Sequence, residues 1–291
     1  MNIYIGITGV ECELDSFDFN NDIFLTKTYA HFMAPFLMAY TMPPSPGKPH
    51  PAPWAPASGG LAFDMTLQLS LPSDSQSKLP YQSKEVAWWI IALLRLRVGP
   101  RLRAPAISSH PLHKDSALCK NLRIQPVEVS PHQLDIDPEA KRTISAADLE
   151  WVRDKWATTF HLFNDSPEFS LLFEAADQAA YNLRSQLALL MLWAGLEELF
   201  SPSKTELRFR ISSHIAAFLM PPGRERLAQQ KAIAKLYDTR SSAAHGRASD
   251  LREPLWDTYD LARRVVVKVL NDNHVPTKTE LEERMFGVEP E

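Results

Sequence analysis

Cysteine is scarce in this chain, which has only Cys12 and Cys119 among its 291 residues. Two cysteines are too few for a disulfide framework or a cysteine zinc site, and they are typical of a reducing compartment. Long apolar runs are also missing: the longest, residues 86–94 and 187–196, are shorter than the roughly 20 residues that a membrane-spanning helix needs. No basic flank precedes an apolar run at the N-terminus, so no signal peptide is predicted. We therefore expect a cytoplasmic protein with no membrane partner.

A strong charge of either sign is absent as well. The formal net charge is -4, with 23% charged and 45% hydrophobic residues, which is ordinary for a globular protein. This balance disfavours a chain that coats nucleic acid non-specifically, although a local basic cleft is compatible with it. No carboxylate cluster of the kind that a two-metal nuclease needs is apparent, so we expect no metal and no other cofactor. The length suits one large or two ordinary domains.

The first half of the sequence predicts a mixed α/β module over residues 1–140. Residues 2–9 and 61–71 have the apolar clustering or alternation of strands, and residues 122–129 are a further candidate. Proline is concentrated in residues 43–56. Because proline removes backbone donors and fixes φ, this segment is predicted to be an extended surface loop.

Residues 85–97 combine helix formers with an apolar surface and predict a buried helix. Trp88 and Trp89 within it resemble a platform for stacking bases. Adjacent helical positions point about 100° apart, however, so the two rings cannot form one flat surface. We expect both tryptophans to pack in the core.

The second half predicts helices almost throughout. Ser145, with Asp148 three positions later, resembles the N-cap of a helix over residues 149–163. Ser166 and Pro167 begin either one long helix or two in close succession, ending at Phe200. Further helices are predicted from the capping-box spacing at residues 203–206 to Pro221, over residues 224–245 and over residues 253–270. Short connections between helices indicate an all-α helical bundle over residues 144–286, which makes the fold class α+β.

One pair of residues points directly to chemistry. Arg240 and His245, with four residues between them, lie near the end of a predicted helix. Phosphodiester cleavage in RNA without a metal needs a fixed cation and a group that titrates near neutrality. Looser spacing also matches Arg103–His110 and Arg208–His214. The proline and serines between Arg103 and His110 predict a loop, and His214 is expected to pack inside a helix.

The residues around this pair resemble a HEPN domain of the ApeA-like kind. The resemblance rests on residues 192–200 (LWAGLEELF), on Glu206 leading into residues 210–219, and on Leu236-Tyr237 before residues 240–246. It covers residues 165–272, with a weaker likeness at residues 90–96. HEPN domains are helical bundles, often dimeric, and many are metal-independent ribonucleases in toxin or antiviral systems.

The resemblance implies a role for each residue of the pair. His245 would be the general acid or base, and Arg240 would hold the scissile phosphate while the 2′-hydroxyl of the RNA attacks it. It further implies an anti-phage or abortive-infection effector that acts on RNA, with tRNA as one target and DNA not expected. In many active members the residue after the arginine is Asn, Asp or His. Here it is Ser241, whose hydroxyl can also bind a phosphate.

The resemblance favours a homodimer. Residues five apart on an ideal helix lie about 140° apart around the axis, so one straight helix would separate Arg240 from His245. Either the helix ends or distorts before Gly246, or two copies face each other across a two-fold axis that brings both pairs into one cleft, and the second option matches the resemblance. The secondary candidates for contacts with RNA are Ser241, Asp238, Tyr237, Arg208 and Arg210.

Other interpretations fit the same residues. Arg240 would pair with Asp238, Glu197 or Glu198, His245 would only stabilise a helix C-terminus, and Tyr237 would belong to the core. The domain would then be a non-catalytic HEPN scaffold that binds RNA or protein. A third interpretation makes the N-terminal module the active part, as a small-ligand sensor.

Overall fold

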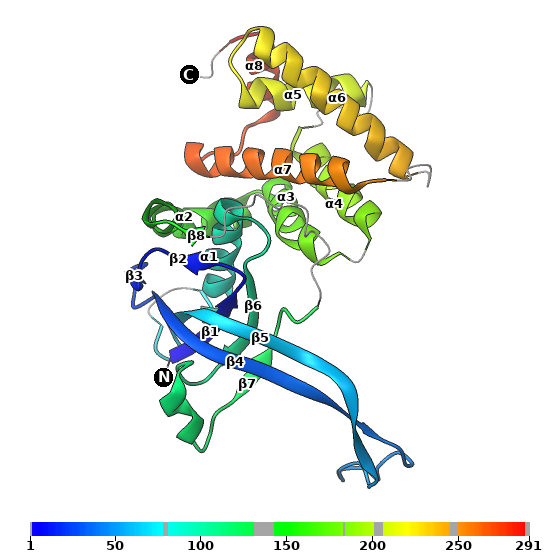
Figure 1. Ribbon diagram of the computed structural model, residues 1–291. Helices are drawn as coiled ribbons and strands as arrows, with labels where there is room; N and C mark the ends of the chain where they lie inside the picture. The colour runs from blue at the N-terminus through cyan, green and yellow to red at the C-terminus, as the bar shows by residue number, and fades with distance from the viewer. Residues whose placement is uncertain are drawn as a thin grey trace. The chain divides into compact units, whose positions relative to one another are not determined.

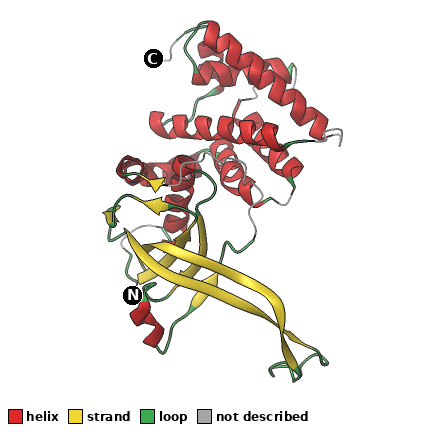
Figure 2. Ribbon diagram, viewed as in Figure 1, coloured by secondary structure: helices red, strands yellow, loops and turns green. Residues whose placement is uncertain are grey.

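The structure is a computed structural model, and it divides the chain into two compact units (Figure 1). The described residues are 2–77, 81–130, 143–182, 184–200, 206–244 and 250–288. The first unit contains the described residues up to Ala87 and Leu102–Val129, and the second contains Trp88–Arg101 and the described residues from 130 onward. The predicted α+β class is confirmed, because an antiparallel sheet in the first unit is followed by a run of helices in the second (Figure 2).

The first unit is built on a six-stranded antiparallel sheet in the order β3-β4-β5-β1-β6-β7. The strands of this unit are β1 (Asn2–Thr8), β2 (Glu11–Cys12), β3 (Ser16–Asp18), β4 (Phe24–Ala39), β5 (Trp54–Pro72), β6 (Arg103–Ser108) and β7 (Ile124–Pro126), and a short 3-10 helix covers Lys114–Leu118. Ile5 of β1 lies opposite Leu69 on one side and Ile107 on the other. The alternation predicted for residues 61–71 is confirmed by the burial of Met65, Leu67 and Leu69.

Strands β4 and β5 form a hairpin that extends beyond the other strands (Figure 1). Its pairing runs from Phe24 opposite Ser70 to Ala39 opposite Trp54. The proline-rich loop prediction is wrong at its end, because residues 54–56 already belong to β5. The prediction of a loop at residues 103–110 is also wrong. Residues 103–108 form β6, in which residues 104–106 and Ser108 are buried, and which is paired on both sides.

The second unit is helical, with one short strand, β8 (Thr143–Ile144). Its helices are α2 (Ala146–Asp165), α3 (Pro167–Gln178), α4 (Ser185–Phe200), α5 (Leu207–Leu219), α6 (Arg224–Ala244), α7 (Arg252–Asp272) and α8 (Lys278–Met285), with a 3-10 turn at Ala179–Tyr181. The residues of α1 (Ser83–Val98) from Trp88 onward belong to this unit as well.

The starts of α2 and α3 follow the predicted caps, whereas α5 begins only after Glu206, which has a left-handed backbone conformation and makes no side-chain cap bond. The Ser145 side chain accepts a hydrogen bond from the Asp148 backbone N–H, and Asp148 completes the capping box. Ser166 caps α3, with Pro167 in its first turn, and two helices in close succession follow as predicted. Residues 203–205 of the predicted capping box lie outside the described residues. Helix α8 was not expected from the sequence.

The core of the second unit combines large aromatic side chains with one buried ion pair. Trp89 is buried and packs against Phe163 and Phe173 at ring-centroid distances of 4.5 and 5.2 Å, which confirms the core role predicted for this residue, whereas Trp88 is only partly buried. An Nη1 nitrogen of Arg95 lies 2.8 Å from an Asp177 carboxylate oxygen, and both side chains are only 3% exposed. Among the helices of the described residues, none is long and apolar enough to cross a membrane.

Candidate functional site

Arg240 lies close to the C-terminal end of α6 and is held by α4. Its Nη2 nitrogen is 2.9 Å from one carboxylate oxygen of Glu197 and 3.1 Å from the other. The two side chains remain 29% and 21% exposed. Of the three acidic partners considered from the sequence, Glu197 is therefore the one that Arg240 contacts, and Glu198 is exposed.

Tyr237 forms the apolar side of this cluster. It is buried, and its ring meets Trp193 of α4 edge to face at 5.1 Å, which confirms its predicted place in the core. The Arg240 guanidinium carbon lies 5.6 Å from the centre of the same ring. Burial, reinforced by the charge of Glu197, raises the pKa of the Tyr237 phenol above its usual value. The phenol therefore stays protonated near neutrality and can act only as a neutral hydrogen-bonding group.

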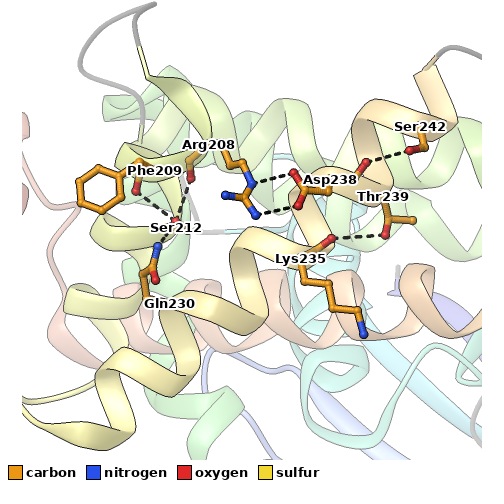
Figure 3. Close-up of polar contacts among 8 residues, drawn as sticks. All are labelled: Arg208, Phe209, Ser212, Gln230, Lys235, Asp238, Thr239 and Ser242. Carbon is orange, nitrogen blue, oxygen red and sulfur yellow. Dashed lines mark hydrogen bonds and ion pairs between the residues drawn. The ribbon is translucent and has the colours of Figure 1, made fainter.

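A second arginine pairs with Asp238, two residues before Arg240 on α6. Figure 3 shows the Arg208 guanidinium of α5 facing the Asp238 carboxylate, with Nε and Nη2 donating to its two oxygens at 2.6 and 2.7 Å. Both side chains are 56% exposed. Arginine binds phosphate through the same pair of parallel hydrogen bonds, but here the Asp238 carboxylate accepts both of them.

Hydrogen bonds on the buried side of α5 fix the position of this arginine. The Ser212 hydroxyl donates to the Arg208 carbonyl oxygen at 2.8 Å, and Gln230 of α6 donates to the Ser212 hydroxyl at 2.9 Å (Figure 3). Helices α5 and α6 are thus joined by the Gln230–Ser212 contact and by the ion pair to Asp238. The remaining candidate on α5, Arg210, has a buried Nε with no hydrogen-bond partner among the described residues.

Gln186, which the sequence did not single out, fixes the end of α6. Its side-chain amide, in the first turn of α4, donates to the Ala243 carbonyl oxygen. Ser241 is exposed on the same helical turn. His245 follows directly, but it lies outside the described residues. The importance of Gln186 is evident only from its hydrogen bond between two helices, so no local pattern in the sequence could have predicted it.

The structure therefore brings together Arg240, Glu197 and Tyr237, and separately Arg208 and Asp238. The other histidine of the spacing search, His214, is buried and its Nδ1 lies 3.0 Å from the Phe200 carbonyl oxygen, which confirms its predicted packing role. Within the described ranges, no group of three or more His, Cys, Asp or Glu side chains is arranged to hold a metal ion. Protein-family models, curated proteins and solved structures were all compared with this chain, and none of them matches it.

Proposed function

We propose that this protein is a metal-independent endoribonuclease of the HEPN type that acts as a toxin or anti-phage effector. The observation that carries the proposal is the position of Arg240. Its guanidinium is partly exposed, lies in the last turn and a half of α6, and precedes His245 by five positions. The resemblance of residues 192–200 and 236–246 to HEPN domains supports the same assignment.

The proposed reaction uses the RNA's own 2′-hydroxyl as the nucleophile. His245 takes the proton of this hydroxyl as its oxygen attacks the adjacent phosphorus, and the bond from phosphorus to the 5′-oxygen breaks. The departing 5′-oxygen takes a proton from water, and the other product carries a 2′,3′-cyclic phosphate. Arg240 donates hydrogen bonds to the phosphate oxygens as negative charge accumulates on them.

Glu197 sets the condition under which Arg240 can act. An ion pair that is partly open to solvent contributes only about 1 kcal/mol or less, because water competes for both groups. A phosphate that approaches the exposed side of Arg240 can therefore share or replace this carboxylate at small cost. Until RNA arrives, the pair keeps the guanidinium beside the Tyr237 ring.

A homodimer completes the proposed site. The resemblance to HEPN domains, which are often dimeric, supports a site in which the two groups act across a two-fold axis. Each copy would contribute one arginine and one histidine to a shared cleft.

The test is cleavage of total RNA and of tRNA by the purified chain in the presence of EDTA. Arg240→Ala and His245→Ala are compared with Arg153→Ala and His161→Ala, which change the same residue types on α2. We expect cyclic phosphate ends from the wild type and from both control variants, and no cleavage by the first two. Equal cleavage by all five proteins would refute the assignment.

A non-catalytic RNA-binding scaffold is the second candidate, and one observation favours it. Both arginines nearest the proposed site, Arg208 and Arg240, already have carboxylate partners, which lowers the positive charge available for catalysis. A scaffold would bind RNA without cleaving it, and Arg240→Ala would weaken this binding. The cleavage assay together with a gel-shift assay separates the two candidates.

A further inference from the structure

A basic pocket lies in the second unit, away from the residues considered above. Its volume is about 360 Å³, and α5, α6, α7 and α8 each contribute to it. Three cationic side chains line it, Arg226, Lys268 and Arg284, and its described lining contains no acidic side chain. Phe218 forms its apolar wall. Three positive charges from three helices around one cavity favour a negatively charged ligand.

Two backbone carbonyls hold Arg226 in the lining of this pocket. Its Nε donates to the Met220 carbonyl oxygen and its Nη1 to the Arg284 carbonyl oxygen, both at 2.9 Å. Burial lowers the pKa of Arg226 below its ordinary value, although an arginine remains charged at neutral pH. The two carbonyls use two of the five N–H groups of the guanidinium, so the others can serve a ligand.

Arg284 and Lys268 approach the same aromatic ring. The Arg284 guanidinium carbon lies 5.6 Å from the centre of the Phe218 ring, and Lys268 Nζ lies 5.3 Å from it. Lys268 Nζ is also 2.9 Å from Asp272, one turn further along α7, and this pair is about one-third exposed on each side. The ring fixes the two cations in place while leaving most of their donors available.

One donor of this pocket lacks an acceptor within the protein. The Nε of Arg284 is buried and has no hydrogen-bond partner among the described residues. A buried N–H without an acceptor costs about 1–3 kcal/mol, and such groups are rare in folded proteins. An anion bound in the pocket would supply the acceptor and would also offset the repulsion between the three cations.

We propose that this pocket binds a phosphate group, carried either by RNA or by a free nucleotide. Planar guanidinium groups match the oxygens of a phosphate, and an ammonium group adds a point charge from a third direction. The pocket lies within the size range of small-molecule sites, so part of the attached nucleoside fits beside the phosphate. None of its three cations belongs to the Arg240 cluster, and the proposal therefore does not depend on the ribonuclease assignment.

Calorimetric titration of the full chain tests the proposal, with inorganic phosphate, AMP and a short single-stranded RNA, with and without a 5′-phosphate, as the probes. The variants are Arg284→Gln, which retains the backbone carbonyl that accepts from Arg226, and Lys268→Gln, which alters a side chain that is about one-third exposed. Arg153→Gln on α2 is the matched control. Thermal unfolding of each variant shows whether it folds.

We expect the wild type and Arg153→Gln to bind at least one probe, and each pocket variant to bind it about tenfold more weakly, since each removes one charge-assisted contact. Binding of phosphate or AMP identifies a free nucleotide as the source, and binding of RNA alone identifies the RNA backbone. Failure of the wild type to bind any probe, or equal binding by the folded pocket variants, overturns the proposal. Arg240→Ala should bind inorganic phosphate and AMP as the wild type does, so the failure of one proposal is distinguishable from the failure of the other.

Discussion

The buried ion pair between Arg95 and Asp177 makes a quantitative prediction possible. Asp177 accepts from Arg95 Nη1 at 2.8 Å and from Trp88 Nε1 at 2.9 Å, and both charged side chains are 3% exposed. The guanidinium of Arg95 also lies 5.4 Å from the centre of the Tyr181 ring. Asp177→Ala would take away the carboxylate while the arginine stays in the core.

The expected loss of stability is large, because the burial of a charge is compensated only while its partner is present. Removal of one member of a buried pair typically costs about 3–5 kcal/mol. The Trp88 indole N–H loses its acceptor at the same time, which places the expected value in the upper part of this range. Replacement of both members, by Asp177→Leu with Arg95→Met, should restore stability to within about 1 kcal/mol of the wild type, since no buried charge then remains.

Urea unfolding of the full chain, followed by circular dichroism, measures these differences. Asp154→Ala is the matched control, because Asp154 pairs with Arg153 at 3.2 Å on the surface of α2 and its side chain is 63% exposed. The control should change the free energy of unfolding by less than about 1 kcal/mol. A similarly small effect of Asp177→Ala, or a double variant less stable than the single one, would refute the reasoning.

Three other substitutions test the packing and the hydrogen bonds of the two units. Gly195→Ala in α4 would place a Cβ 2.6 Å from the Leu172 Cα atom in α3, and urea unfolding should show a loss of about 1–3 kcal/mol because backbone must move. Ser145→Ala removes the N-cap of α2 and should cost about 1 kcal/mol in the same assay, and no change would contradict the cap. The Ser83 backbone N–H and hydroxyl lower the pKa of Asp74 below its ordinary value of 3.8. The ionised Asp74 carboxylate therefore stabilises the fold above pH 3.8, and this stabilisation is lost as the pH falls through the lower folded pKa. The difference in the free energy of unfolding between the wild type and Asp74→Asn should therefore disappear toward about pH 3.

The sequence predicts best where the structural signal is local. The caps at Ser145 and Ser166 and the alternation of residues 61–71 depend on neighbours within a few positions, and all are found in the structure. Strand β4 was missed because its outer part has apolar residues on both faces, so that alternation fades where Pro35 interrupts it. Its strand character comes from β5, a partner that only the fold supplies.

The same distinction applies to the candidate site. The position of Arg240 could be predicted from the sequence, but its choice of Glu197 over two other acids depends on how α4 packs against α6. The role of Gln186 could not be predicted for the same reason, because its hydrogen bond to the Ala243 carbonyl oxygen joins two different helices. The basic pocket takes its three cations from three helices, so no short pattern in the sequence contains it.

The two strands of the long β4–β5 hairpin should separate progressively, beginning at the tip of the hairpin. Among the described residues between 33 and 62, β4 pairs only with β5 and β5 only with β4. The sequence between His31 and Asp64 has a single formally charged residue, Lys48. Each pair of residues in the outer part of the hairpin is therefore stabilised only by the neighbouring pairs of the same two strands. Amide hydrogen exchange should be fastest near Ala39 and should slow step by step toward Leu25, without global unfolding of the sheet.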